Sequence, residues 1–254
     1  MSFVWQALLL GGCMVSAANA QEKLNRVEQH GSMHETIGEQ HHHGRVKLEA
    51  LLQRPHFFGV GALERLDGEI SIFDSKAVVT GVGSDGKPVV LNDRAASLQA
   101  ALFVGGQVPE WREVFLSDAV DVAKFDQTIA EKATELGIDT SKPFLFAIEG
   151  EFQKVRLHVI NGACPLHSRL RKKTIAADQK PIEQDLEQVS GRLIGVHAKD
   201  AVGKLTHPAT SVHAHLIFTN DKGELLTGHL EQVGLQKNAR LLLPVQSSGG
   251  EASK

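Results

Sequence analysis

The stretch TSVHAHLIFTNDKGELLTGHLE at residues 210–231 constrains the fold most strongly, because its pattern predicts a β-hairpin. Its first half alternates and is rich in β-branched and aromatic side chains, which favours a strand. The NDKG sequence that follows is a turn signal, and its Gly223 can supply the left-handed residue of a three-residue loop. If the loop is 221–223, His229 lies directly across from His215.

The three histidines of this hairpin are then predicted to share one face. Residues two apart in a strand point to the same side, so the imidazoles of His213 and His215 converge. His229 joins them only in this register, because a loop one residue longer would turn it to the opposite face. Three neutral imidazoles with coordination positions left open are typical of a catalytic zinc site. The alternative is an exposed pair of strand histidines that binds nothing.

Composition bounds the class of protein. The 254 residues, 42% hydrophobic and 22% charged, can bury a sizeable core in one larger domain or two small packed ones. A formal net charge of -3 provides no electrostatic footprint for nucleic acid. Beyond the N-terminus, no run approaches the roughly 20 apolar residues that a membrane span needs. We therefore expect no nucleic-acid partner and no membrane span.

The N-terminus predicts export. Residues 1–20 are apolar and end in the sequence ANA, a cleavage pattern typical of a secretory signal peptide. The expected location is therefore periplasmic or secreted. A lipoprotein signal with lipidation at Cys13 is the alternative. Cleavage after Ala20 leaves Cys164 as the only thiol, so no internal disulfide can form.

Composition also divides the rest of the chain. Residues 21–45 are polar and rich in histidine, and we expect a flexible segment there, whose histidines could alternatively collect metal for the site. Residues 246–254 are predicted to form a disordered tail. Residues 46–245 then form the folded domain.

Periodicity predicts many strands and one clear helix, so the fold class is α+β. The helix is expected over 118–136, where apolar side chains recur at helical spacing. We interpret Gly105-Gly106 and Glu149-Gly150 as interruptions between strands, and 161–189 as a loop. Strands are expected at 56–60, 69–73, 78–82, 88–91, 98–104, 144–148, 152–160, 191–197, 212–218 and 241–243.

Strand alternation orients two sets of polar residues. It places Glu69 on the face opposite the two isoleucines that follow it, so the pattern alone predicts a solvent-facing glutamate. In the longest predicted strand, Arg156 and His158 share one face with Phe152 and Lys154.

Four motifs together resemble the acetolactate decarboxylase family. HAHLIFTND followed by GH is similar to the family signature, and GVGALERLDGEISIFD at 59–74 resembles its Leu-Asp-Gly-Glu run. KPFLFAIEGEFQKV at 142–155 and LIGVHA at 193–198 follow in the family's order. The resemblance spans about residues 46–235 and implies a β-rich α+β fold with two packed sheet-containing lobes and few helices.

The resemblance also implies an activity, which is zinc-dependent decarboxylation of 2-acetolactate, a small 2-hydroxy-3-oxo acid, to acetoin and carbon dioxide. His213, His215 and His229 would hold Zn²⁺, and Glu69 would handle the proton. The family's active-site arginine aligns with His158, so either His158 or the neighbouring Arg156 would take its role on the substrate's charge. A homodimer is the default expectation.

Other polar residues have weaker patterns. Family members also place a carboxylate near the C-terminus at the metal, and no residue here matches it clearly. Glu231 shares strand parity with His229, whereas Glu251 lies in the tail. His207 could hydrogen-bond the substrate, and no partner pattern marks Cys164 as a nucleophile.

Two alternatives remain open from the sequence. The replaced arginine, and a hairpin loop longer than that of the family, favour a metal-dependent lyase or hydrolase that acts on a different exported substrate. The histidine-rich N-terminal segment fits a non-catalytic periplasmic metal-binding protein.

Overall fold

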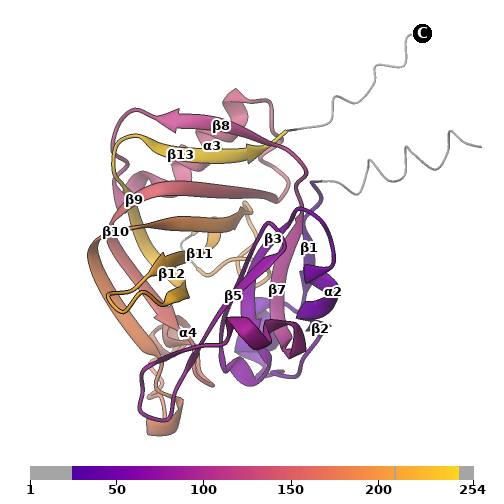
Figure 1. The fold of residues 1–254 in the computed structure, drawn as a ribbon, viewed down its shortest axis with the longest axis vertical. Helices are drawn as coiled ribbons and strands as arrows, with labels where there is room; N and C mark the ends of the chain where they lie inside the picture. Colours follow the sequence, from indigo (N-terminus) through magenta and orange to yellow (C-terminus); the bar gives the residue numbers. More distant parts are fainter. Residues whose placement is uncertain (1–24, 209, 246–254) are drawn as a thin grey trace, which may run out of the picture.

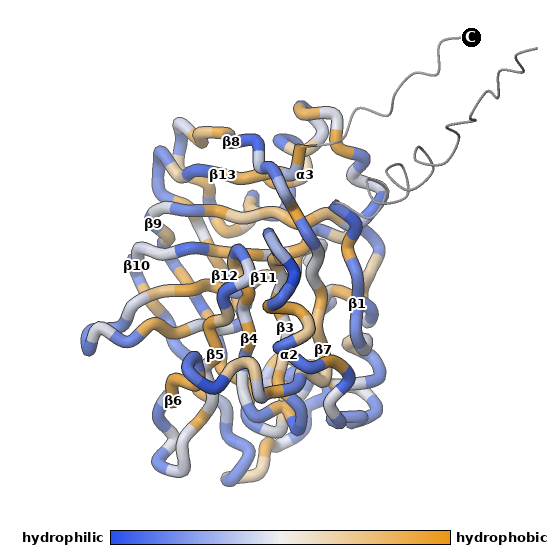
Figure 2. The backbone as a smooth tube through the Cα atoms, turned by 45° about the vertical axis from the view of Figure 1, so that its right-hand side comes forward, coloured by the Kyte–Doolittle hydropathy of each residue, from blue (hydrophilic) through white to orange (hydrophobic). Residues whose placement is uncertain are grey.

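Two antiparallel sheets packed against each other form the body of the protein (Figure 1). The computed structural model describes residues 25–208 and 210–245. The predicted β-rich α+β fold with two packed sheet-containing lobes and few helices is confirmed. The signal peptide predicted at 1–20 and the tail predicted at 246–254 lie outside the described residues. Most hydrophobic residues lie in the strands, whereas the loops are mainly hydrophilic (Figure 2).

The first sheet has the order β1-β7-β3-β4-β5-β6, and β2 also pairs with β7. Helix α2 (Leu48–Leu52) packs with this sheet through Leu48 and Leu51, which are buried. Its strands are β1 (Glu28–His30), β2 (Val46–Lys47), β3 (Phe57–Leu63), β4 (Gly68–Phe73), β5 (Lys76–Val82), β6 (Pro88–Val90) and β7 (Gln99–Gln107). Short helical turns lie at His34–Gly38, Glu64–Leu66 and Asn92–Ser97.

The second sheet has the order β10-β11-β12-β9-β13-β8, with an additional pairing of β10 and β9. Because β10 and β12 each pair with both β9 and β11, these four strands close into a ring. The strands are β8 (Trp111–Leu116), β9 (Phe144–Val159), β10 (Ile182–His197), β11 (Val212–Thr219), β12 (Leu225–Leu235) and β13 (Ala239–Pro244). The remaining helices are α3 (Phe125–Glu135) and α4 (Pro165–Arg171), and short turns lie at Val122–Lys124 and Ala177–Gln179.

The two strands predicted on either side of Glu149-Gly150 form one strand, β9, of 16 residues. Pairing with β10 along the whole length of β9 carries the strand through the glycine, with Gly150 opposite Gly191. Lys154 has a left-handed backbone, φ 50°, which changes the alternation. The predicted face is therefore wrong for Phe152, which lies in the core with Val155 and Leu157. Arg156 and His158 do share a face, because both reach the Glu231 carboxylate.

Gly105 and Gly106 do not interrupt a strand as predicted, because both lie inside β7. Their glycine identity serves a close approach between strands: a Cβ atom at Gly105 would overlap the carbonyl oxygen of Phe58. The facing strand has the same requirement, since a Cβ atom at Gly61 would overlap the carbonyl oxygen of Leu102. The glycine-rich GVG motif is thus a packing feature of the first sheet.

Replacing Gly61 by alanine is expected to destabilise the protein by about 1–3 kcal/mol, because backbone must move to admit the methyl group. Chemical denaturation of the wild type and the variant would measure this change in the free energy of unfolding. Gly38→Ala is the control, because the nearest atom to its added Cβ is 3.2 Å away on the exposed His34 ring. Equal losses for both variants would contradict the close-approach explanation.

The helix predicted at 118–136 is shorter in the structure. It begins with the turn at Val122–Lys124, where the Asp121 side chain accepts a hydrogen bond from the Val122 amide at 3.0 Å, and continues as α3. The loop predicted at 161–189 is also wrong, because it contains α4 and the first part of β10. This part of β10 is charged and largely exposed, so pairing with β9, not an apolar pattern, defines it.

Part of the segment expected to be flexible at 21–45 belongs to the first sheet, since β1 pairs antiparallel with β7. The sheet therefore begins before the predicted boundary at 46. Within the ranges 25–208 and 210–245, no helix has the length and apolar character to cross a membrane.

Apolar and polar contacts join the two sheets. Phe58 and Val60 of β3 share one buried cluster with Ile194 and Val196 of β10. Beside this cluster, the hydroxyls of Ser71 and Thr227 are 2.6 Å apart, and the Thr227 amide donates to the Thr80 hydroxyl at 2.8 Å. These contacts fix β4 and β5 against β12 next to the histidine hairpin.

Candidate active site

The predicted hairpin register is confirmed. His215 of β11 pairs with His229 of β12, and Thr219 pairs with Leu225 across the loop. Gly223 has the expected left-handed backbone, φ 79°. One ring nitrogen from each of His213, His215 and His229 lies within 4.8 Å of the others, and all three side chains are buried.

The state of these three rings suits metal binding. Burial lowers the pKa of His213 to about 3 and lowers the pKa values of His215 and His229 well below the ordinary value, so the imidazoles are neutral at pH 7. Neither ring nitrogen of His215 has a hydrogen-bond partner among the described residues. Buried nitrogens without partners are costly, and a metal ion held by three imidazoles would satisfy one of the two on His215. The residues present therefore fit a metal ion.

Glu69 of β4 lies beside this cluster and is only 3% exposed. Its Oε2 is 3.6 Å from Nε2 of His215, and its Oε1 accepts a hydrogen bond from the Ile160 amide at 3.2 Å. Burial raises the pKa of Glu69 to about 8, against the smaller opposing effect of the Ile160 hydrogen bond. The solvent-facing position predicted from alternation is wrong, because the second sheet covers this face of β4.

The structure separates the two candidates for the family's arginine. His158 of β9 is buried, its ring centre is 4.8 Å from that of His229, and its Nε2 is 3.9 Å from Oε1 of Glu69. The Arg156 side chain is 46% exposed, and its Nε is 3.6 Å from Oε2 of Glu231 and 3.9 Å from Asp185. Thus His158 lies with the histidine cluster, whereas Arg156 lies toward the surface.

Glu231 is the largely buried carboxylate next to His158. Its Oε1 is 2.8 Å from Nδ1 of His158, and its Oε2 contacts the guanidinium of Arg169. Although burial raises the pKa of Glu231, the hydrogen bonds from His158 and Arg169 outweigh it and lower this pKa to about 2. Strand parity with His229 pointed to Glu231 in the sequence, but nothing there pointed to Arg169, because α4 itself was not expected.

A cavity of about 460 Å³ borders the cluster at His229. Phe125 and Val212 give it apolar walls, and Glu231 and His207 add polar groups. The His207 ring lies at 5.1 Å from the His229 ring, and burial lowers the pKa of His207 to about 4. Of the three clustered histidines only His229 lines this cavity, so a small molecule there would meet the cluster at His229.

Cys164 has a structural role at the start of α4. Its buried Sγ accepts a hydrogen bond from the His167 amide at the start of α4, and burial raises its pKa to about 11. A thiol with this pKa is a poor nucleophile at neutral pH. His197 is likewise packed away from the cluster, stacked on Phe144 at 4.9 Å.

Comparisons with solved structures find this fold in alpha-acetolactate decarboxylases. The enzyme from Bacillus subtilis strain 168 superposes with a TM-score of 0.60 at 16% identity, over 86% of this chain and 85% of that chain. The enzyme from Bacillus subtilis subspecies spizizenii has a TM-score of 0.61 with the same identity and coverage. A Staphylococcus aureus protein of unknown function, similar to alpha-acetolactate decarboxylase, has a TM-score of 0.59 at 14% identity, over 86% of this chain and 85% of that one. These likenesses show a shared fold.

The sequence comparison goes further. No protein with curated annotation matches this chain. The family model described as alpha-acetolactate decarboxylase, however, matches residues 29–246, which is most of the chain and includes both sheets. The chain belongs to the alpha-acetolactate decarboxylase family.

Proposed function

We propose that this protein is a zinc-dependent decarboxylase that converts 2-acetolactate to acetoin and carbon dioxide. The observation that carries the proposal is the convergence of three neutral, buried histidines and the buried Glu69 at the junction of the two sheets. Membership of the family supplies the reaction. The signal-like sequence at 1–20 supports an exported protein, periplasmic or secreted.

The chemical obstacle in this reaction is negative charge. When carbon dioxide leaves a carbon next to a ketone, the electron pair of the broken carbon–carbon bond moves toward the ketone oxygen, and an enolate forms. A zinc ion held by His213, His215 and His229 would supply the positive charge that stabilises this oxygen.

The chain's own residues handle the hydroxyl of the substrate and the proton. His158 lies close to both His229 and Glu69, so it is the residue placed to hydrogen-bond the hydroxyl of the substrate. Arg156 is assigned no contact with the substrate, since it lies toward the surface. The proton on the carboxyl of Glu69 passes to the carbon that carbon dioxide has left, and solvent restores it. Burial of these groups excludes water from the developing charge.

A second candidate is a metal-dependent lyase or hydrolase for another small molecule. One observation favours it: among the described residues that line the 460 Å³ cavity, none is lysine or arginine. A substrate with a less acidic group than a carboxylate would suit these walls.

Removal of the metal tests the proposal. We expect purified protein to produce acetoin from racemic acetolactate, to lose this activity after chelator treatment, and to regain it with zinc. Heat-denatured protein controls for spontaneous decarboxylation. An absence of acetoin from protein shown to contain zinc would exclude this activity and favour the second candidate.

A further inference from the structure

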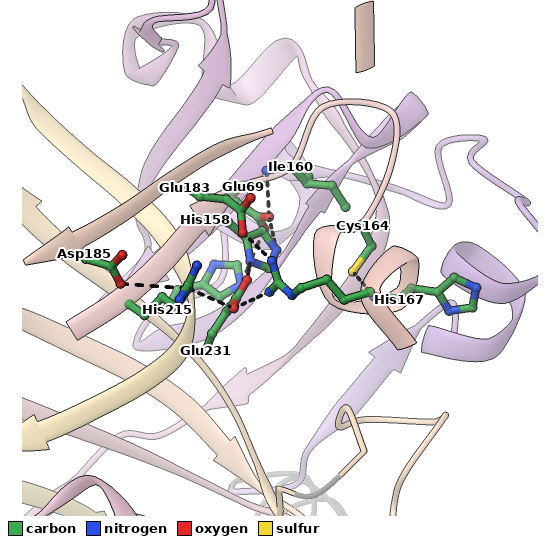
Figure 3. A network of polar contacts seen from close by, with 11 residues as sticks. Glu69, His158, Ile160, Cys164, His167, Glu183, Asp185, His215 and Glu231 are labelled. Atoms are coloured by element: carbon green, nitrogen blue, oxygen red, sulfur yellow. Dashed lines mark hydrogen bonds and ion pairs between the residues drawn. The ribbon is translucent and has the colours of Figure 1, made fainter. Parts of the chain in front are cut away.

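Glu231 contacts the buried His158 with one carboxylate oxygen (Figure 3) and the exposed Arg169 with the other. Its side chain is 7% exposed, and both carboxylate oxygens have partners. Oε1 faces Nδ1 of His158 at 2.8 Å, whereas Oε2 contacts the Arg169 guanidinium and lies 3.6 Å from Nε of Arg156. Arg169 comes from α4 and also contacts Glu183, so a surface helix clamps the carboxylate.

This arrangement determines which nitrogen of His158 carries hydrogen. An ionised carboxylate that already accepts from arginine can only accept from the histidine as well, so Nδ1 carries the hydrogen and donates it. The ring orientation is thereby fixed. Nε2 faces Glu69 Oε1 at 3.9 Å, which is beyond hydrogen-bonding distance.

We propose that Glu231, clamped by Arg169, is a positioning residue that orients His158 so that its unprotonated Nε2 accepts a hydrogen bond from the hydroxyl of the substrate. This inference rests on the proposed decarboxylase function and deepens it. His158 stands in the place of the family's arginine, and its effect depends on the orientation of its ring. Arg169, which contacts Glu231, acts on the substrate only through that ring.

The competing role for Glu231 is direct metal ligation, because it shares strand parity with His229. The contacts oppose this role. Both oxygens of Glu231 already have partners, and Glu231 is not among the described side chains whose donor atoms converge with those of His213, His215 and His229. The zinc affinity should therefore separate the two roles.

The experiment compares Glu231→Ala and Glu231→Gln in the zinc-loaded protein. We expect Glu231→Ala to lower kcat/KM for acetolactate by about 10–100-fold, mainly through a higher KM, because the substrate hydroxyl loses its oriented hydrogen-bond acceptor. Glu231→Gln keeps an oxygen that can accept from Nδ1–H, so it should recover much of this loss. Arg169→Ala should have a smaller effect in the same direction. Glu113→Gln, which alters another carboxylate bound to arginine on the distant β8, is the matched control and should leave both constants unchanged.

Two readouts do not depend on turnover. Nitrogen NMR of His158 should show hydrogen on Nδ1 in the wild type and in Glu231→Gln, and a mixture of tautomers in Glu231→Ala. Competition titration should give the same zinc affinity for all these variants. A loss of zinc affinity in Glu231→Gln would overturn the proposal in favour of ligation, and an unchanged tautomer in Glu231→Ala would overturn it directly.

These readouts also separate this inference from the proposed function. A wild type that turns over acetolactate while Glu231→Ala keeps both its tautomer and its KM would overturn only the positioning role. A wild type with no turnover but with the expected tautomer change would overturn the decarboxylase and support the orientation of His158 by Glu231.

Discussion

Replacing His215 by alanine is expected to weaken zinc binding by more than about 100-fold, beyond the range for residues that only support a ligand. His215 is fully buried, and its ring nitrogens have no hydrogen-bond partner among the described residues, so metal coordination is the interaction that the variant would lose. Acetoin production should disappear with the metal. A zinc competition titration and the acetoin assay on the same samples would measure both effects.

His197→Ala is the matched control for this variant. His197 is also a buried histidine, but it stacks on Phe144 outside the cluster. Its replacement should lower the stability of the fold and leave the zinc affinity unchanged. Equal zinc affinities for His215→Ala and the wild type would exclude the histidine cluster as the metal centre.

The hairpin was predictable because its determinants are local. The NDKG turn fixes the loop, the loop fixes the register, and the register brings His229 opposite His215. No distant contact is needed for this result. The metal candidates could therefore be named from one continuous stretch of 22 residues, numbered 210–231.

The rest of the site depends on packing between distant segments. Glu69 alternates with isoleucines as a solvent-facing residue would, and only the second sheet makes its face an interior one. The contacts of His158 with Glu231, and of Glu231 with Arg169, join residues 73 and 62 positions apart. Periodicity within one strand carries no information about such contacts.

Backbone irregularities explain the wrong strand predictions. The glycines at Gly105 and Gly150 predict strand breaks, but the pairing with the neighbouring strands continues through both. Conversely, Lys154 has no sequence signal for a left-handed backbone, and yet it changes which residues of β9 face the core. For this reason strand parity failed to distinguish Arg156 from Phe152.

Replacing Glu69 by glutamine is expected to lower kcat by about 10²–10⁴-fold, the range for removal of a general acid or base. The amide keeps the shape of the side chain and an oxygen that can accept from the Ile160 amide, so folding should be preserved. It has no acidic proton to deliver to carbon. Because Glu69 is not in the group of converging metal-ligand atoms, the zinc affinity should change little.

Measurement of kcat, KM and zinc affinity on one preparation would separate a proton-transfer role from metal ligation. Glu64→Gln provides the control, since Glu64 belongs to the same motif but lines a different cavity. A parallel loss of zinc affinity and kcat would make Glu69 a metal ligand. An unchanged kcat would assign the proton to another group, and His207, at the same cavity as His229, would then be the next residue to replace. Loss of kcat alone would place the proton on the buried Glu69, whose position depends on the packing of both sheets.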